Sequence, residues 1–591
     1  MCGIFGYVGH ERPAASMILD ALRKLEYRGY DSWGLAVGAN SHVDVVKHAG
    51  RISEASAELP PARIGFGHTR WATHGGVTDA NAHPHVDCSG RFAVIHNGII
   101  ENFQSIRDRL EAAGHRFASD TDSEALAHLV EDAAGERTDP GVLTAALRAV
   151  FGQIRGLNAI IVMDTVTGQM AAVKNISPLV VGMGAEGSFI ASDAVALIDH
   201  ADRVHYLEDG QIVTIGPDGM SFLDTATGTP QDVEFQPLTI SAGDTSLNGY
   251  PHFMVKEIYE QPSVLWTIGR EYGDRIREFA NLIRQSYGTF LVGCGTASYA
   301  ALTGSYLFSR IARRHVNFVV GSEFKYQEHF LTDRSLVVAL SQSGETADII
   351  EAVLAAKRRG AKVAALVNVL GSTLDRLADF TIPLGAGPEQ CVLSTKAYTA
   401  KVAILMLTAH ALNDSEHVGR EHLWKTVDGM ERALADESVS RIRGIAEEIA
   451  ERDHCYIIGR GLSYPTALES ALKIKEVSYM HAEGFAGGEL KHGVIALVEP
   501  GTPCFVFSPL DETRDDILSG AMEMRSRGGQ IIGISPENDR IFDIHVPVAD
   551  VGNGSPLVNV IPAQLLGYHL ALLRGLDPDK PRNLAKSVTV K

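Results

Sequence analysis

The sequence begins Met1-Cys2-Gly3-Ile4-Phe5-Gly6, and this stretch sets the expectation for the fold around it. The initiator methionine is normally removed before a small residue, so Cys2 would then carry both a thiol and a free α-amine. An α-amine titrates near ~8, close to a free thiol near ~8.5, and can serve as the base for its own nucleophile. Gly3 and Gly6 would let the backbone pass close to a substrate. Two interpretations stay open: an amino-terminal nucleophile, or a small residue leading into a buried strand.

Composition places the chain among ordinary globular proteins. It has 591 residues, of which 45% are apolar and 21% are charged, enough for about three or four domains. The formal net charge of −19 disfavours nucleic-acid binding, whose usual footprint is basic. The six cysteines show no CxxC spacing, which predicts a reduced, cytoplasmic chain without disulfides. We expect no signal peptide and no apolar run near the ~18 residues that span a membrane.

Residues 1–240 read as one mixed domain that is rich in strands. Its loops hold most of the polar residues, among them the stretch from Gly67 to Gly75 and the tripeptide His96-Asn97-Gly98. The apolar pattern predicts strands at Ile4–Val8, Leu35–Val37, Phe92–Ile95, Ala159–Met163 and Phe189–Ala191, and helices at Pro13–Leu25, Phe103–Ala113 and Ser123–Ala134.

These loops contain what a glutamine-hydrolysing site needs. Arg70 could hold an α-carboxylate by a two-pronged hydrogen bond, and Asp122 could hold an α-ammonium. Asn97 and Gly98 could supply a side-chain amide and a backbone N–H as an oxyanion hole. The alternatives are a surface ion pair for Arg70 and Asp122 and a type I′ turn for Asn97-Gly98. Each alternative is the simpler one for a single residue, but the set is consistent with Cys2.

Four motifs stand out in this half of the chain. They are Met1-Cys2-Gly3-Ile4, Leu25-Glu26-Tyr27-Arg28-Gly29-Tyr30-Asp31-Ser32, His68-Thr69-Arg70-Trp71-Ala72-Thr73-His74-Gly75 and His96-Asn97-Gly98-Ile99-Ile100-Glu101-Asn102. They resemble class II glutamine amidotransferases, which implies an N-terminal-nucleophile αββα sandwich. The resemblance implies that Cys2 attacks glutamine, that Asn97 and Gly98 form the oxyanion hole, and that Arg70 and Asp122 hold the amino-acid end. Trp71, Thr73 and His74 would line the site.

A histidine-rich stretch raises the question of a metal. Its members His74, His83, His85, Cys88 and His96 match none of the usual zinc spacings. We therefore expect polar structural loops and no metal.

The second half of the chain contains an internal repeat. Leu291–Tyr299 parallels Ile457–Tyr464, and Val338–Thr346 parallels Phe505–Thr513. Each copy is an apolar strand followed by a turn and a helix, which predicts two similar α/β domains with parallel sheets. The expected boundaries are a glutaminase domain at 1–240, a connection at 241–256, repeat domains at 257–435 and 436–580, and a tail at 581–591.

The two copies differ where a phosphate could bind. The first copy has Ser341, Gln342, Ser343 and Thr346 between strand and helix, where hydroxyls, an amide and helix N–H groups suit a phosphate. The alternative is a plain helix cap. The second copy has Pro509 and Asp511, which lack a donor and repel phosphate respectively, so we predict one phosphate site. No nucleotide loop is present: Gly293–Ser298 lacks the third glycine of a dinucleotide fingerprint.

The second copy carries groups suited to proton transfer. Glu469, Lys473 and Glu476 share one face of a predicted helix, and His492 follows. Carboxylates and a histidine in a cleft suit proton transfer beside a carbonyl, whereas solvent-exposed salt pairs are the alternative. Lys586, in the tail, could form a Schiff base with a ketose or be an exposed terminal charge.

Further motifs extend the resemblance over the whole chain. They are Ser341–Asp348, Ser394-Thr395-Lys396-Ala397, Ala482-Glu483, Gly488–Gly493 and Asn583–Val590. They resemble the paired sugar isomerase domains of the glucosamine-6-phosphate synthase family, which implies glutamine and fructose 6-phosphate as substrates, no cofactor and a homodimer.

The resemblance also implies roles for individual residues. Lys586 would form the imine at C2, Glu476 would move the proton between C1 and C2, and His492 would open the ring from the neighbouring subunit. Glu469 and Lys473 would support this cluster. The phosphate would be bound by Ser341, Gln342, Ser343 and Thr346, and the sugar by Thr296, Val392 and Ser394. Ala297, Leu393, Val494 and Trp33 depart from the family pattern without removing a proposed catalytic group.

The expected activity is therefore the first step of hexosamine synthesis, with ammonia from Cys2 channelled to the sugar. Three alternatives stay open: another class II amidotransferase, a sugar-phosphate sensor with degenerate catalysis, and an enzyme acting on a modified sugar phosphate. The first lacks an ATP-type or phosphoribosyl-pyrophosphate motif. Retention of Cys2, Glu476, His492 and Lys586 argues against the second.

Overall fold

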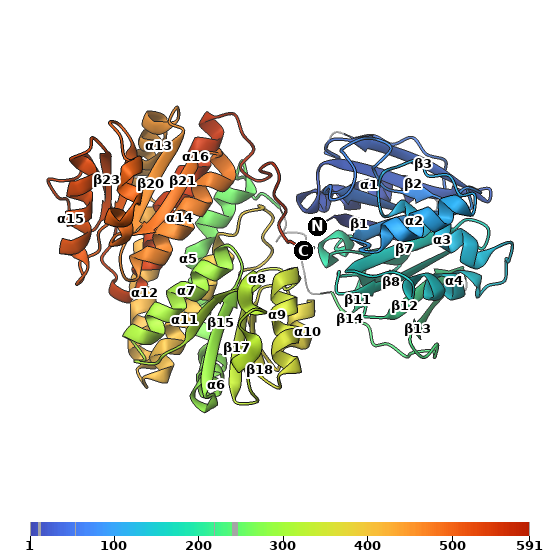
Figure 1. Cartoon of the computed structure of the whole chain (residues 1–591), viewed down its shortest axis with the longest axis horizontal. Helices are drawn as coiled ribbons and strands as arrows, with labels where there is room; N and C mark the ends of the chain where they lie inside the picture. The colour runs from blue at the N-terminus through green and yellow to red at the C-terminus, as the bar shows by residue number, and fades with distance from the viewer. Residues whose placement is uncertain (1, 10–13, 54, 218, 239–245, 590–591) are drawn as a thin grey trace. The chain divides into compact units, whose positions relative to one another are not determined.

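A computed structural model describes residues 2–9, 14–53, 55–217, 219–238 and 246–589. The chain forms two compact units (Figure 1). The first unit contains Met1–Ser246 together with the tail Ala585–Lys591, and the second contains Leu247–Leu584. Residues 241–245 of the predicted connection lie outside the described residues, and helix α5 begins at Phe253, within the range predicted as connection.

The first unit is built on two antiparallel sheets. The eight-stranded sheet has the order β14-β11-β9-β10-β1-β4-β2-β3, and the six-stranded sheet has the order β13-β12-β8-β7-β6-β5. The strands are β1 Gly3–Gly9, β2 Ser32–Ala39, β3 His42–Ala49, β4 Ile64–Arg70, β5 His85–Val86, β6 Phe92–Gly98, β7 Asn158–Asp164, β8 Gln169–Asn175, β9 Val180–Gly184, β10 Gly187–Ala191, β11 Arg203–Tyr206, β12 Gln211–Gly216, β13 Gly219–Asp224 and β14 Gln236–Pro237.

Helices cover the outer faces of both sheets, which gives four layers. Helix α1 packs on the larger sheet through Ile18 and Leu22, and α3 and α4 pack on the smaller sheet through residues such as Leu126 and Leu147. Phe66 belongs to the apolar layer between the sheets. The predicted αββα sandwich is confirmed. Its helices are α1 Ala14–Lys24, α2 Phe103–Ala112, α3 Glu124–Ala134 and α4 Val142–Phe151, with short 3₁₀ turns at Glu26–Arg28 and Ala194–Leu197.

The second unit contains two parallel five-stranded sheets with the same topology. Their orders are β16-β15-β17-β18-β19 and β21-β20-β22-β23-β24, so each strand of the first sheet has a counterpart in the second. This correspondence confirms the predicted repeat. The strands are β15 Gly288–Gly293, β16 Asn317–Val320, β17 Ser335–Ser341, β18 Lys362–Val367, β19 Phe380–Pro383, β20 His454–Gly459, β21 His481–Ala486, β22 Pro503–Phe507, β23 Gln530–Ser535 and β24 Ile544–Pro547.

One continuous apolar core runs through both halves of this unit. It joins helices that follow the first sheet, for example through Leu405, to helices that follow the second, for example through Ile474 and Leu566. The helices are α5 Phe253–Glu271, α6 Gly273–Gln285, α7 Thr296–Arg310, α8 Gly321–Phe324, α9 Ala347–Arg358, α10 Thr373–Leu377, α11 Lys396–Leu412, α12 Glu416–Ala433, α13 Asp436–Ile449, α14 Ser463–Ser478, α15 Arg514–Arg525 and α16 Ser555–Leu573, with 3₁₀ turns at Glu328–Phe330, Glu489–His492, Val494–Leu497 and Gly552–Gly554.

One helical segment among the described residues has the length and composition of a membrane span. It covers Gly552–Leu573 with mean hydropathy 1.3, and 83% of its apolar window is buried inside the protein. This corrects the expectation that no apolar segment approaches spanning length. The helix packs against α13 and α14, as a core helix of a globular unit does.

Candidate active sites

Cys2 lies in a pocket of the first unit at the ends of three strands. It directly precedes β1, whose Gly3 pairs with Thr69 of β4, while β6 ends at Gly98. The pocket brings together all of the residues predicted for glutamine hydrolysis. It is lined by Cys2, His68, Arg70, Trp71, Thr73, His74, His83, His96, Asn97, Gly98, Thr121, Asp122, Ser123 and Thr589.

The Cys2 thiol is held by the chain beyond β4. The Trp71 backbone N–H donates to Cys2 Sγ over 3.2 Å. Burial raises the pKa of the Cys2 thiol, and the Trp71 N–H opposes that shift. Because the thiolate is the reactive form, a thiol with a raised pKa needs a base close by, and this need fits the α-amine predicted from the sequence.

The Asn97 side chain has a fixed orientation. Its Nδ2 donates to the carbonyl oxygen of Cys2 over 2.9 Å, and its Oδ1 accepts from His68 Nε2 over 3.1 Å. Burial lowers the pKa of His68 to about 3, so the ring is neutral. Its Nε2 also lies 3.1 Å from the His96 carbonyl oxygen, which can only accept, so Nε2 carries the proton. An amide nitrogen has two donors, and the second remains for an oxyanion. His68 stands in the quoted motif, but no role was predicted for it from the sequence.

Asn97 and Gly98 are not a turn. Both are paired with β7, at Ala159 and Asn158 respectively, so the type I′ alternative is wrong. Gly98 has a φ of +135°, and a Cβ there would lie 1.9 Å from the Leu157 carbonyl oxygen. Only glycine fits this position.

Arg70 and Asp122 are buried, with exposed fractions of 4% and 3%, so the surface ion-pair alternative is wrong. Arg70 donates to the carbonyl oxygens of His74, Gly75 (3.2 Å) and Gly76 (3.2 Å). One Asp122 oxygen accepts from the Ile100 N–H over 2.7 Å. Arg70 therefore shapes the loop at the pocket mouth.

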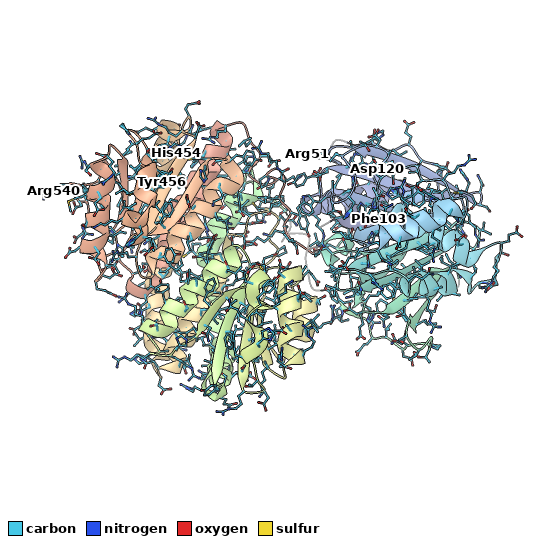
Figure 2. The ribbon with its side chains drawn as sticks, in the orientation of Figure 1. Arg51, Phe103, Asp120, His454, Tyr456 and Arg540 are labelled. Atoms are coloured by element: carbon cyan, nitrogen blue, oxygen red, sulfur yellow. The ribbon has the colours of Figure 1, made fainter. Side chains whose placement is uncertain are left out.

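The histidines near this pocket form a hydrogen-bonded network. His96 bonds Ser123 Oγ and Asn158 Oδ1, each at 2.8 Å, and His85 bonds Thr121 Oγ1 at 2.9 Å. The ring of His74 meets Phe103 (labelled in Figure 2) at a centroid distance of 5.5 Å. Burial lowers the pKa values of His83, His85 and His96.

In the second unit, α14 presents a buried charged cluster. Lys473 Nζ lies 2.9 Å from Glu476 Oε2, 3.5 Å from Glu469 Oε1 and 2.9 Å from Thr296 Oγ1. Lys473 and Glu469 are 1% and 0% exposed, so the alternative of solvent-exposed salt pairs is wrong. Lys473 also donates to the Ser394 carbonyl oxygen over 3.3 Å. The fold thus brings together five of the predicted residues for sugar chemistry.

The protonation of this cluster follows from one ammonium shared by two carboxylates. Burial raises the pKa of Glu469 to about 7, although Lys473 opposes the shift. Burial lowers the pKa of Lys473, but the attraction of Glu469 and Glu476 outweighs it and raises that pKa overall. Lys473 therefore stays charged, and Glu469 titrates near neutral pH.

The predicted phosphate loop joins β17 to α9. Ser341 Oγ lies 3.5 Å from Thr346 Oγ1 and accepts from the Gly344 N–H over 3.0 Å. Thr346 caps α9 without a side-chain cap hydrogen bond, so its hydroxyl is not used as a plain helix cap. In the second copy, Asp511 accepts from the Thr513 N–H over 2.9 Å, which places a carboxylate where an anion would otherwise bind.

Three further predicted residues are Val392, His492 and Lys586. Val392 donates its N–H to the Asp579 carbonyl oxygen over 3.0 Å. His492 is exposed and ends the 3₁₀ turn Glu489–His492, and within the described ranges it makes no hydrogen bond or ion pair. Lys586 belongs to the tail that is grouped with the first unit, so its role at the sugar stays a prediction.

Comparison with known proteins decides the family. A glutamine amidotransferase domain model matches residues 68–199, and an SIS domain model matches residues 282–411 and 448–574. The chain is 42% identical to the glutamine–fructose-6-phosphate aminotransferase (isomerizing) of Thermococcus kodakarensis, over 100% of both chains. The chain belongs to the glutamine–fructose-6-phosphate aminotransferase family. A member from Thermus thermophilus is 41% identical, again over 100% of both chains.

A solved structure supports the same assignment for the second unit. The C-terminal domain of the Francisella tularensis glucosamine-fructose-6-phosphate aminotransferase is 34% identical, with a TM-score of 0.53. It aligns with 56% of this chain and 99% of its own. The second unit thus shares the fold of that domain.

Proposed function

We propose that this chain converts glutamine and fructose 6-phosphate to glutamate and glucosamine 6-phosphate, the first step of hexosamine synthesis. Family membership over the full length supports the overall reaction. The observation that carries the proposal is that the Cys2 thiol, the Asn97 amide and Arg70 line one pocket, because a class II glutaminase needs these groups around one carbonyl.

The glutaminase step begins with attack of Cys2 Sγ on the side-chain amide carbonyl of glutamine. The carbonyl oxygen becomes an oxyanion, which the second N–H of Asn97 and the Gly98 N–H stabilise. The α-amine of Cys2 takes the thiol proton and passes it to the leaving ammonia. Water then hydrolyses the thioester to glutamate and restores the thiol. Arg70 and Asp122 hold the amino-acid end, with Trp71, Thr73 and His74 around it.

The sugar step uses the second unit together with the tail. Ser341, Gln342, Ser343 and Thr346 bind the phosphate, and Thr296, Val392 and Ser394 contact the sugar. Lys586 forms the imine at C2 and ammonia displaces it. Glu476 moves a proton from C1 to C2, with Lys473 and Glu469 setting its charge, and His492 opens the ring. Ammonia passes between the sites through the protein, because in water it would be protonated and lost.

We also propose the setting of this enzyme. It is cytoplasmic and homodimeric, with His492 of one subunit serving the sugar site of its partner, and it acts on neither nucleic acid nor membrane. The absence of CxxC spacing among its cysteines supports the cytoplasmic setting. The exposure of His492 supports its use by a partner subunit.

The direct test is an assay of purified protein with glutamine and fructose 6-phosphate. We expect equal amounts of glutamate and glucosamine 6-phosphate. Glutamate without amino sugar would refute the sugar substrate. Amino sugar that forms from free ammonia but not from glutamine would refute the role of Cys2.

A further inference from the structure

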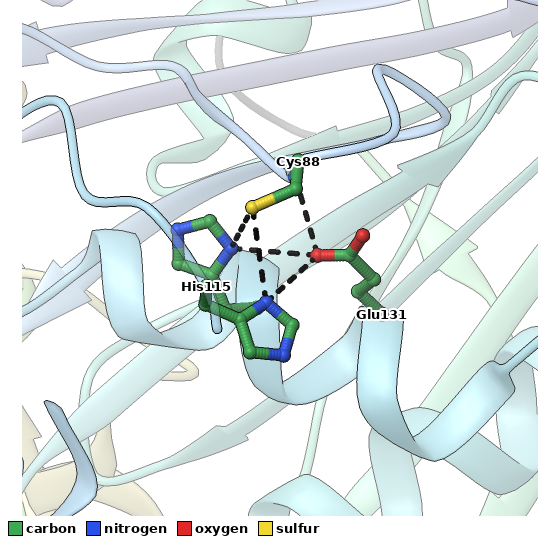
Figure 3. A group of neighbouring side chains, drawn as sticks. Cys88, His115 and Glu131 are labelled. Atoms are coloured by element: carbon green, nitrogen blue, oxygen red, sulfur yellow. Dashed lines mark hydrogen bonds and ion pairs between the residues drawn. The ribbon is translucent and has the colours of Figure 1, made fainter. Parts of the chain in front are cut away.

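Four potential metal ligands converge on the outer side of the first unit, away from the groups used in glutamine hydrolysis. Cys88 lies between β5 and β6, His115 lies between α2 and α3, and His128 and Glu131 are one turn apart on α3. Figure 3 shows Cys88, His115 and Glu131 pointing toward one another. Each contributes one ligand atom, and these four atoms lie within 4.8 Å of one another.

Two of the distances between these atoms match the edges of a zinc tetrahedron, and two lie just outside that range. Cys88 Sγ is 3.8 Å from His115 Nδ1 and 3.6 Å from His128 Nδ1. Glu131 Oε2 is 3.1 Å from His115 Nδ1 and 3.5 Å from His128 Nδ1. Zinc–sulfur bonds of about 2.3 Å and zinc–nitrogen or zinc–oxygen bonds of about 2.0–2.2 Å give tetrahedral edges of about 3.3–3.6 Å.

The surrounding groups orient these ligands as zinc sites require. His115 Nε2 faces Asp132 Oδ1 at 2.8 Å, so its proton belongs on Nε2 and its Nδ1 lone pair faces the cluster. Such a carboxylate behind a ligating histidine is typical of zinc sites. His128 Nε2 lies 3.7 Å from Glu124 Oε1, beyond hydrogen-bond distance, and has no hydrogen-bond partner among the described residues. The Arg116 backbone N–H donates to Cys88 Sγ over 3.4 Å, which favours a thiolate.

From this geometry we propose that Cys88, His115, His128 and Glu131 bind a structural Zn²⁺ ion. Thiolate and imidazole ligands select zinc among the common divalent cations, and four protein ligands make a closed site without an open position for catalysis. One thiolate and one carboxylate balance the charge of the ion. Because Cys88 is exposed to solvent, the ion can reach the site from solution.

The ion would fasten the loop before β6 to α3. Strand β6 carries Asn97 and Gly98, and α3 directly follows Asp122 and Ser123. The metal therefore supports the glutamine pocket from outside without touching it. The sequence expectation of no metal rested on five neighbouring residues, of which only Cys88 belongs to this cluster. His115 lies 27 residues and His128 lies 40 residues from Cys88 along the chain, and Glu131 lies farther still. No short spacing pattern covers such separations.

The first test is elemental analysis of the full-length, tag-free protein purified without chelator. We expect about one zinc per chain in the wild type and at least a tenfold lower content in Cys88→Ser and His128→Gln. Cys294→Ser, a change at another cysteine that is not fully buried, is the matched control and should keep its zinc. Zinc that persists in both cluster variants, or stoichiometric iron or copper in place of zinc, would overturn the proposal.

The second test does not depend on how well the variants fold. Wild-type protein is stripped with a chelator and titrated with Co²⁺, which gives an intense thiolate-to-cobalt absorption band only when sulfur is a ligand. We expect the band to saturate at one equivalent and Zn²⁺ to abolish it. Stripped protein that binds neither ion at micromolar concentration, or binds cobalt without that band, would refute the site.

Asp132→Asn should weaken zinc binding about 10–100-fold while leaving the stoichiometry intact.

Discussion

Replacing Lys473 by methionine tests the buried cluster on α14. The substitution keeps the length of the side chain and removes the ammonium that lies between Glu469 and Glu476. Glu469 is 0% exposed, so its carboxylate would lose its main charged partner in a dry environment. Breaking a buried ion pair on one side costs about 3–5 kcal/mol of unfolding free energy.

The loss should depend on pH in a defined direction. The folded pKa of Glu469 is raised to about 7 from an ordinary 4.5. Its contribution to stability is therefore full below pH 4.5 and is lost as the pH rises through about 7. Without Lys473 the folded pKa rises further, so variant and wild type diverge most above pH 7. At pH 8.5 we expect the variant to lose the full amount of about 3–5 kcal/mol of unfolding free energy. At pH 6 the loss of unfolding free energy should be smaller by at least about 1.4 kcal/mol, the equivalent of one pKa unit.

The measurement is calorimetry of the full chain. It follows the unfolding transition whose midpoint temperature rises when fructose 6-phosphate is added. About 2 °C per kcal/mol is expected for a unit of this size, so the midpoint should fall by roughly 6–10 °C at pH 8.5. Lys475→Met changes an exposed lysine on the same helix and should shift the midpoint by about 1 °C or less. Adding Glu469→Gln to Lys473→Met should recover part of the loss. An equal loss at both pH values, or no recovery in the double variant, would refute the reasoning.

Four further substitutions test the two proposed sites and the division of labour between them. Cys2→Ala should abolish glutamine hydrolysis while sugar-phosphate isomerisation survives, and loss of both in a folded protein would contradict it. His68→Ala should lower kcat for glutamine hydrolysis about 10-fold or more, because Asn97 loses the bond that orients it. Replacing Asn97 itself by alanine should lower kcat about 10²–10³-fold. An unchanged kcat for His68→Ala in a glutamate-release assay would show that Asn97 is held without His68. Lys586→Ala should stop glucosamine 6-phosphate formation while glutamate release from glutamine continues, and normal product formation by this variant would remove lysine from the mechanism.

Local patterns were sufficient for much of the fold. The apolar alternation around Phe92–Ile95 and Ala159–Met163 predicted strands that the structure extends to β6 and β7. The repeat predicted two sheets of identical strand order, because duplicated sequence carries duplicated periodicity. The same local patterns did not reveal Gly552–Leu573 as an apolar segment of spanning length, since scattered polar residues interrupt it.

The sites were predicted unevenly. Glu469, Lys473 and Glu476 could be placed on one helix face from their spacing, but only the packed core decides that the lysine and Glu469 are buried and share charge. His68 had no assigned role, because its bond to Asn97 joins two residues that lie 29 positions apart along the chain, on different strands.

The sequence by itself determined the repeat and predicted Cys2 as the nucleophile and the residue types for each chemistry, since these depend on composition and short-range spacing. Tertiary structure alone decided which of them meet. It showed Asn97-Gly98 paired in a sheet instead of forming a turn, and it brought Cys88 together with His115, His128 and Glu131. Such contacts depend on strand register and helix packing, and these are set by the burial of the whole core, which no short stretch of sequence contains.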